Sequence, residues 1–199
     1  METNLEVIIG NIEETTADAI VNAANAVRIG GGGIDGAIHR AAGPKLAAAC
    51  AEFPRNSRGE WCPTGEARVT KAFRISSAQY VIHTAGPNCS CGYVEARHAP
   101  LLASCYRAVI AAALENKCST LAIPCISTGI FGFPMDRAVR IAVRTANEAI
   151  AGAPDFKVTF VIWAGDSKAA ETKALYESEI AAIRQSGVTN GGEQAHDKV

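Results

Sequence analysis

The sequence predicts an α/β domain of three layers, in which helices cover both faces of a mainly parallel sheet. Short apolar runs rich in β-branched residues alternate with amphipathic helical patterns along the chain, and this alternation is typical of parallel α/β folds. Several of the runs are apolar throughout, as expected for strands that are covered on both faces. The length of 199 residues suits one domain with a sizeable core.

Five apolar runs are predicted to be strands because each is short and bounded by polar or turn-forming residues. In chain order they are Leu5–Ile9, Ala19–Val21, Tyr80–Thr84, Thr120–Ile126 and Val158–Trp163.

Four further segments have the apolar spacing of amphipathic helices. In the first, apolar residues recur at i, i+3, i+4, i+7 and i+8 from Ile34 to Ala42, and Gly43 followed by a proline is a typical stop. The others run from Leu102 to Ala113, from Val139 to Ala146 and from Ala174 to Ile183.

Composition excludes several classes of protein. The net charge of −1 gives no field that would attract nucleic acid or an acidic membrane surface. No apolar run approaches the roughly 18 residues of a membrane span, and no signal peptide is evident at the start of the sequence. The odd number of seven scattered cysteines indicates reduced thiols. We therefore expect a cytoplasmic protein, with the nucleus as a second location.

The end of the chain differs from the rest in composition. From about Gln185 it becomes polar and glycine-rich, which is typical of a disordered segment. The sequence thus predicts one domain over residues 1–185 and a disordered tail over 186–199. We expect a monomer without a cofactor or a bound metal.

The stretch from Gly30 to Gly36 contains four consecutive glycines, which run into a predicted helix with Asp35 in its first turn. Glycine loses much backbone entropy on folding, so such a run indicates a backbone that must come close to something. At a helix N-terminus that something is often a phosphate held by N–H groups. By position alone, Asp35 is a helix cap or a catalytic group.

Asn22 and Asn25 leave the end of the preceding predicted strand, just before the glycines. Ligands of open α/β sheets lie outside the carboxyl ends of the strands, so Asn25 and Asp35 can share one site. Turn formation is the alternative role for both asparagines. The glycine run formally matches a dinucleotide fingerprint, but no acidic residue follows at the expected distance, and no Walker motif is present.

A second loop has the same plan: a buried strand, small polar residues, glycines and then a helix. It runs from Ser127 to Pro134. Two such loops facing each other would hold a diphosphate from both sides with backbone N–H groups. Phe131 could pack on a sugar or base, or fill the core beneath the loop.

With both loops considered, the chain resembles the macrodomain family, and within it the MacroD-type hydrolases. The resemblance covers residues from about 5 to 183 and rests on five blocks in family order. The blocks are Asn22–Asn25, Gly30–Gly43, Cys62–Ala67, Val81–Pro87 and Ile126–Pro134.

The resemblance implies a three-layer α/β/α macrodomain fold with a mixed, mostly parallel six-stranded sheet and an ADP-ribose pocket. It also implies hydrolysis of ester-linked adducts at the distal ribose, such as O-acetyl-ADP-ribose and mono-ADP-ribose on Asp or Glu side chains of proteins. The implied catalytic residues are Asp35 and Asn25: Asp35 would be the general base, and Asn25 would hold the distal ribose hydroxyls. The implied ligand-binding residues are Asn11, Ile12, Asn25, Gly32, Gly33, Ile34, Asp35, Ser127, Thr128, Gly129, Ile130 and Phe131.

One position departs from the family pattern. The first strand of the family usually ends Gly-Asp-Ile, whereas here Gly10 is followed by Asn11. The asparagine oxygen can accept the same hydrogen bond from the adenine amine, but without a charge the bond is weaker. Trp163 falls near the position where family members often place an aromatic residue beside the adenine.

The implied mechanism raises a physical difficulty for Asp35. A carboxylate at a helix N-terminus is expected to have a lowered pKa, which makes it a feeble base. A bound diphosphate would raise that pKa again. His39, one turn further along, is expected to orient the helix or loop.

Three other interpretations remain open at this stage. A reader module would bind ADP-ribose without cleaving it, and a phosphatase acting on ADP-ribose 1″-phosphate would use the same pocket. Cys89, Cys91 and His98 have the soft-ligand character of a zinc site, but they lack a fourth ligand.

Overall fold

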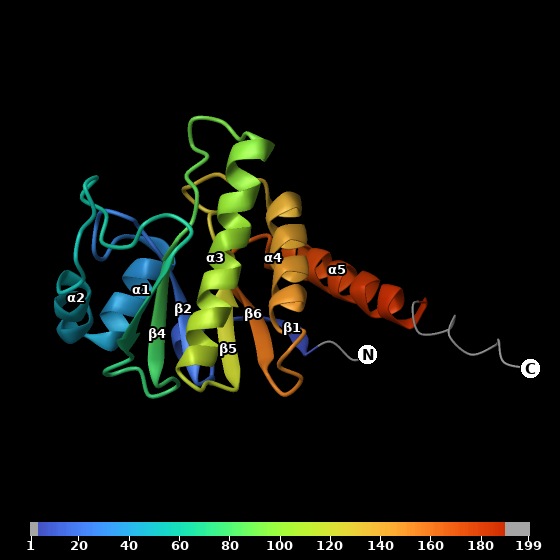
Figure 1. The fold of residues 1–199 in the computed structure, drawn as a ribbon, viewed down its shortest axis with the longest axis horizontal. Coiled ribbons are helices and arrows are strands. Elements are labelled where there is room, and N and C mark those ends of the chain that lie inside the picture. Colours follow the sequence, from blue (N-terminus) through green and yellow to red (C-terminus); the bar gives the residue numbers. More distant parts are fainter. Residues whose placement is uncertain (1–3, 190–199) are drawn as a thin grey trace, which may run out of the picture.

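A computed structural model describes residues 4–189, which form one six-stranded sheet between two layers of helices (Figure 1). The strands are β1 (Leu5–Gly10), β2 (Ala19–Ala24), β3 (Ala67–Lys71), β4 (Tyr80–Ala85), β5 (Thr120–Pro124) and β6 (Lys157–Trp163). The helices are the 3₁₀ turn η1 (Ile12–Glu14) and α1 (Gly33–Ala42), α2 (Pro44–Ala51), α3 (Glu95–Glu115), α4 (Met135–Ala149) and α5 (Ala169–Thr189).

The strand order in the sheet is β1-β6-β5-β2-β4-β3. All neighbours are parallel except β3, which pairs antiparallel with β4 at the edge. The predicted mixed, mostly parallel sheet is therefore confirmed. Because the carboxyl ends of parallel strands meet at one edge of a sheet, the segments that follow β1, β2, β5 and β6 lie at the same edge.

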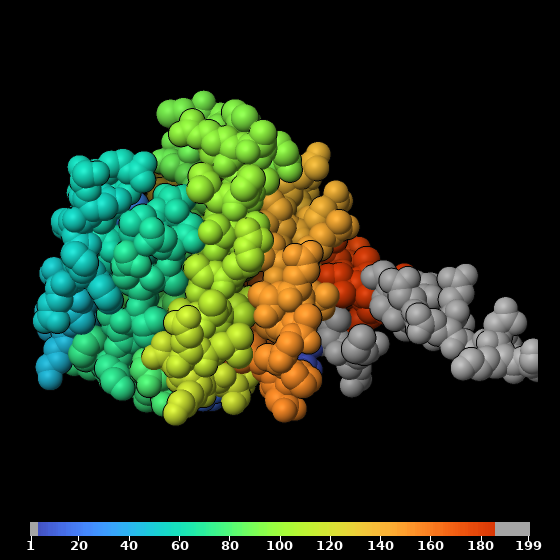
Figure 2. All heavy atoms as spheres, viewed as in Figure 1, coloured from blue at the N-terminus to red at the C-terminus, as the bar shows by residue number. Residues whose placement is uncertain are grey.

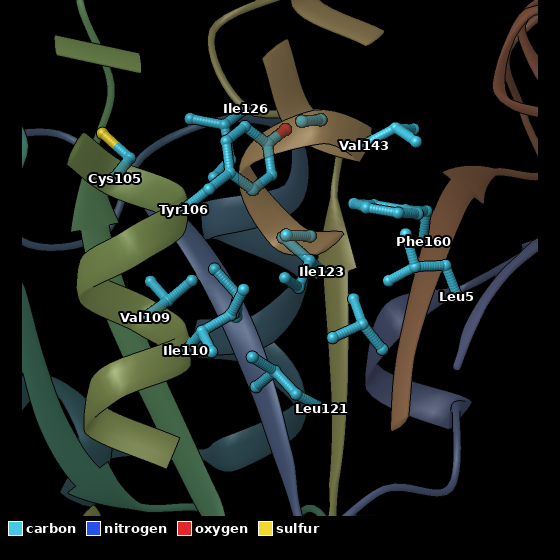
Figure 3. Packing of buried hydrophobic residues seen from close by; sticks show 14 of the residues in the cluster. Leu5, Cys105, Tyr106, Val109, Ile110, Leu121, Ile123, Ile126, Val143 and Phe160 are labelled. Atoms are coloured by element: carbon cyan, nitrogen blue, oxygen red, sulfur yellow. The ribbon is translucent and has the colours of Figure 1, made fainter. Parts of the chain in front are cut away.

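Each face of the sheet has its own hydrophobic core. α3, α4 and α5 cover one face, where Tyr106 and Ile110 of α3 and Leu121 of β5 belong to one buried cluster (Figure 3). α1 and α2 cover the other face, where Ile38 and Leu46 pack with Ile20 of β2. Figure 2 shows α3 and α4 forming the surface over the first of these cores. The sheet is thus buried on both faces, as the apolar strands predict.

The five predicted strands and four predicted helices are all present, with shifted ends. β5 ends at Pro124 rather than Ile126, and α3 begins at Glu95, before its Pro100. The 3₁₀ turn η1, the strand β3 and the helix α2 were not predicted. β3 is a short edge strand of mostly half-buried residues, so it has no apolar run. α2 begins with Pro44 at its first position, where proline is favoured, although the same residue also ends α1.

The predicted boundary at residue 185 does not coincide with the end of an element. α5 continues to Thr189, so the first residues assigned to a disordered tail are helical, and residues 190–199 lie outside the described part. Among the described residues, no helix is both long enough and apolar enough to span a bilayer.

Asp18 joins the beginnings of β2 and β5. Its Oδ2 accepts hydrogen bonds from the backbone N–H groups of Ser119, at 2.7 Å, and Thr120, at 3.0 Å. These donors stabilise the ionised carboxylate and hold the pKa of Asp18 below its usual range. The bonds therefore stabilise the fold at neutral pH, and this contribution is lost as the pH falls through the lowered pKa.

Replacing Asp18 by alanine should lower the free energy of unfolding by about 1–2 kcal/mol at pH 7, because two backbone donors lose a charged acceptor. The loss should shrink at acid pH. Urea unfolding at pH 7 and pH 3 measures it, with Asp155→Ala, at an exposed position, as the control. Equal effects of the two substitutions would contradict this role.

Candidate active site

A cleft of about 720 Å³ opens at the edge where the parallel strands end. Four segments that are separated in sequence line it, each at or after the carboxyl end of a different strand. They are Gly10–Glu13 after β1, Gly32–Asp35 after β2, Cys125–Phe131 after β5 and Val161–Trp163 of β6. The cleft therefore brings together both glycine loops that the sequence analysis identified.

Both loops supply backbone N–H groups to this cleft. Gly33, Ile34 and Asp35 form the first turn of α1, where N–H groups have no partner within the helix. In the second loop, the N–H groups of Thr128–Phe131 make no hydrogen bond within residues 4–189. Unpaired N–H groups at a helix N-terminus and in a glycine loop favour an anion. The cleft is therefore suited to phosphate oxygens on two sides.

The second loop is held in a fixed shape around a residue with a positive φ. Ser127 has φ +66°, is only 7% exposed and lines the cleft. Its carbonyl oxygen accepts from Phe133 N–H at 3.0 Å, and the carbonyl oxygen of Phe131 accepts from Cys89 N–H at 2.7 Å. The Ser127 hydroxyl is buried without a partner among the described residues, so a ligand could satisfy it.

Asp35 lies at the end of α1 that faces the cleft and is 6% exposed. Its Oδ1 accepts a hydrogen bond of 2.7 Å from Asn22 Nδ2 and lies 3.4 Å from His39 Nε2. Its Oδ2 points toward the glycine loop, 3.2 Å from where a Cβ on Gly31 would lie. No side chain caps α1 by a hydrogen bond, so Asp35 does not act as its cap.

Burial raises the pKa of Asp35, while the hydrogen bond from Asn22 and the nearby His39 partly oppose that rise. The expectation of a lowered pKa was therefore wrong. Removing the carboxylate from water disfavours its ionised form more than the hydrogen bond from Asn22 and the nearby His39 favour it. A raised pKa makes Asp35 a stronger base than an exposed aspartate.

A chain of buried polar groups lies behind Asp35. Asn22, fully buried on β2, also places Nδ2 3.1 Å from Nδ1 of His83. On the other side of this ring, His83 Nε2 lies 3.0 Å from Thr70 Oγ1 and 3.6 Å from Cys50 Sγ. Asn22 is thus neither a turn former nor a ligand contact. An asparagine inside an otherwise apolar strand was the sequence signal for this network.

Comparison with known proteins gives the family. Residues 21–142, more than half of the chain, match the family model Macro domain. The chain belongs to the macrodomain family.

Three relatives of this macrodomain are informative. O-acetyl-ADP-ribose deacetylase of Salmonella gallinarum is 48% identical over 75% of this chain and 81% of its own length. ADP-ribose glycohydrolase MACROD2 of Xenopus laevis is 46% identical over 70% of this chain but only 31% of its own length. The Oceanobacillus iheyensis macrodomain solved with ADP is 35% identical, with a TM-score of 0.79 over 92% of both chains.

The Oceanobacillus macrodomain has also been solved as three variants. In two of them an asparagine or an aspartate is replaced by alanine, and in the third, solved with ADPR, a glycine is replaced by valine. Together the comparisons confirm the predicted macrodomain fold and family. The hydrolase names of the two sequence relatives likewise confirm the prediction of a hydrolase.

Asn25 lies at the edge of the site in this macrodomain. It follows Ala24, which lines the cleft, but Asn25 itself is not part of the lining. Its Oδ1 accepts from the N–H groups of Val27 and Arg28, at 3.0 and 2.9 Å, so it shapes the loop that leads to the glycines. Its Nδ2 makes no hydrogen bond within residues 4–189 and remains a donor for a ligand. The other predicted ligand-binding residues all line the cleft.

The far end of the cleft combines polar and aromatic groups. Asn11 and Ile12 line it together with Trp163, which is 58% exposed and is paired in register with the neighbouring Gly10. The amide of Asn11 donates to Glu14 Oε2 at 3.2 Å, which leaves its Oδ1 as an acceptor. The sequence analysis missed Asp166, which lines the cleft near Trp163, because no motif marks it.

The three residues considered for zinc are dispersed. Cys89 is buried, Cys91 is exposed, and Nδ1 of the buried His98 accepts from Val94 N–H at 2.9 Å. Across residues 4–189, no three His, Cys, Asp or Glu side chains are placed to share a metal ion.

Two glycines of the first loop have different structural roles. A Cβ on Gly36 would lie 2.4 Å from the carbonyl oxygen of Gly31, so the backbones of the loop and α1 could not approach as they do. A Cβ on Gly32 would meet no atom within 4 Å, and its φ of −92° suits any residue. Because Gly32 lines the cleft, its missing side chain leaves room for a ligand.

These roles predict effects of different size on stability. Gly36→Ala should lower the free energy of unfolding by about 1–3 kcal/mol, because the backbone must shift, whereas Gly32→Ala should change it by less than about 0.5 kcal/mol. Denaturant unfolding of the ligand-free protein tests both. A comparable loss in Gly32→Ala would contradict the open space at that position.

Proposed function

We propose that this macrodomain binds ADP-ribose and hydrolyses ester-linked adducts at its distal ribose, with Asp35 orienting or activating the water. The proposed substrates are O-acetyl-ADP-ribose and mono-ADP-ribose attached to Asp or Glu side chains of proteins. The name of the Salmonella relative, O-acetyl-ADP-ribose deacetylase, supports the first substrate class. The name of the Xenopus relative, ADP-ribose glycohydrolase, supports a substrate that contains ADP-ribose. That the protein works as a cytoplasmic monomer remains a prediction.

The observation that carries the proposal is the state of Asp35. A binding module needs no buried carboxylate in its anion site, because a negative charge there repels the phosphates. Here the carboxylate is buried at the cleft, accepts a 2.7 Å hydrogen bond on Oδ1 and leaves Oδ2 on the side of the glycine loop. An unoccupied oxygen with a raised pKa suits a base that takes a proton from water.

The residues that line the cleft suggest how ADP-ribose would be oriented in it. The diphosphate would lie between the N–H groups of Gly33–Asp35 and those of Thr128–Phe131, and the distal ribose would lie beside Asp35. The adenine would lie between Asn11 and Trp163, with Asn11 Oδ1 accepting from its amine. Nδ2 of Asn25 is the donor available for the ribose hydroxyls.

The Oceanobacillus variants support this placement. The asparagine, glycine and aspartate replaced in them are separated by seven and three residues. The same spacing separates Asn25, Gly32 and Asp35 in this chain. Asparagine, glycine and aspartate therefore stand at matching intervals in the two proteins.

The proposed step is ordinary ester hydrolysis. Oδ2 of Asp35 takes a proton from water as the water oxygen bonds to the carbonyl carbon of the acyl group. The bond from that carbon to the ribose oxygen then breaks, and the ribose oxygen takes the proton that Asp35 had removed from the water. This gives ADP-ribose and the free acid and returns Asp35 to its ionised form. Positioned base catalysis of this kind contributes about 10²- to 10⁴-fold to a rate.

Asp35→Ala should therefore reduce release of ADP-ribose from a Glu-linked substrate by about 10²- to 10⁴-fold, while ADP-ribose still binds. Product release measured by chromatography and binding measured by calorimetry separate the two effects. Asp166→Asn, which removes the charge of another carboxylate in the cleft, is the matched control and should retain turnover.

Two outcomes would contradict the proposal. Wild-type protein that binds ADP-ribose but releases none would be a reader module. An Asp35→Ala variant that loses binding but keeps turnover in the bound fraction would exclude Asp35 as the base.

The rate should also depend on pH in a defined direction. The ionised form of Asp35 is the base, and burial raises its pKa, so kcat should fall on the acid side with a midpoint above the usual range of an aspartate. Deacetylation of O-acetyl-ADP-ribose measured between pH 4 and pH 8 tests this. A rate that stays constant down to pH 4 would contradict a raised pKa.

A further inference from the structure

The network behind Asp35 begins with a residue on each of two neighbouring strands. Asn22 of β2 and His83 of β4 are directly paired in the parallel register, so their side chains lie on the same face of the sheet, under α1 and α2. Both are fully buried. The rings of Trp61 and His83 pack in a T-shaped arrangement with 5.4 Å between their centroids. This packing leaves the imidazole little freedom to turn.

Hydrogen-bond chemistry fixes the proton positions in this network. The two protons of Asn22 Nδ2 face Asp35 Oδ1 and His83 Nδ1. An amide nitrogen only donates, so His83 Nδ1 must accept and carries no proton. Burial lowers the pKa of His83 to about 3, so the ring is neutral and its proton is on Nε2. That proton faces Thr70 Oγ1 at 3.0 Å, whose own hydroxyl points to the carbonyl oxygen of Val81 at 3.5 Å.

The orientation of the Asn22 amide leaves one of its polar atoms without a hydrogen bond. Its Oδ1 is buried and has no hydrogen-bond partner among the described residues, which is unfavourable. In the reversed orientation Oδ1 would face the carboxylate of Asp35 and Nδ1 of His83, both of which are acceptors here. Thr70 donates its hydroxyl proton to the carbonyl oxygen of Val81 and so accepts from His83 Nε2–H, which leaves Nδ1 unprotonated without reference to Asn22. The unprotonated Nδ1 of His83 therefore keeps the donor of Asn22 directed at Asp35.

We infer that His83, acting through Asn22, is a positioning residue that reserves Oδ2 of Asp35 for the reacting water. Asn22 donates a hydrogen bond to Oδ1 of Asp35, and His39 Nε2 also lies close to this oxygen. Oδ2 faces the glycine loop at the cleft. The kinetic consequence of this inference rests on the proposed function, whereas the proton positions do not.

Few other titratable or charged groups face Asp35. His39 and Arg40 belong to α1 itself, and Cys50 of α2 is close enough for the charge of Asp35 to contribute to raising its pKa. From β2 and β4, the carboxylate is reached by Asn22 and, through it, His83. The bond from Asn22 favours the ionised carboxylate, so loosening Asn22 raises the pKa of Asp35 further.

His83→Leu removes the acceptor and should lower kcat by about 10- to 100-fold while KM changes by less than about threefold, because it displaces the base rather than a ligand contact. The acid limb of kcat should move to higher pH. His83→Asn, whose side-chain oxygen lies near the position of Nδ1, should recover most of the loss. His98→Leu removes another buried histidine that does not line the cleft and should leave kcat unchanged.

Unchanged kcat and acid limb in His83→Leu, or equal losses in His83→Leu and His98→Leu, would overturn the inference. A second measurement avoids the risk that His83→Leu fails to fold. The ¹⁵N spectrum of the wild-type imidazole, without substrate, should show neutral His83 with its proton on Nε2 down to about pH 4. A proton on Nδ1 would overturn the inference. Wild-type protein that shows this Nε2–H form but has no turnover would contradict the proposed function alone.

Discussion

Burial of the Asp35 carboxylate is the constraint on which the rest of the site depends. Removing an ionised carboxylate from water is costly unless donors replace the water. Asn22 supplies one such donor at 2.7 Å, and Asn22 can do so because the register of β2 and β4 places His83 beside it. The otherwise apolar core under α1 and α2 therefore contains the polar side chains of Asn22 and His83, which lie behind the carboxylate of Asp35.

On the cleft side of Asp35, the glycine loop provides backbone N–H groups for an anion. A tight approach of α1 to the loop, possible only because Gly36 has no side chain, presents N–H groups at the end of the helix that carries Asp35. The negative carboxylate and the anion-binding N–H groups thus share one turn of helix. The second loop, held by hydrogen bonds to Phe133 and Cys89, lines the same cleft. In the proposed function, these two loops bind the diphosphate and the buried carboxylate of Asp35 activates the water.

Much of this arrangement could be predicted from the sequence, because strand runs, helical spacing and loop glycines are local signals. The edge strand β3 and the helix starting at Pro44 were missed, since neither has a strong apolar pattern. The predicted direction of the shift in the pKa of Asp35 was wrong, because the burial of this side chain depends on the whole fold and not on its position in a helix. The roles of Asn22 and His83 depend on strand register, which brings together residues far apart in the chain. Asp166 has no motif at all.

Carboxylate ¹³C titration of Asp35 by NMR, with and without ADP-ribose, tests the central claim most directly. The account predicts a midpoint above the usual range of an aspartate in the free protein, because burial outweighs the donors. The midpoint should rise further when the negative diphosphate binds nearby. A midpoint at or below the usual range, unchanged by ADP-ribose, would contradict a buried base beside the bound ligand.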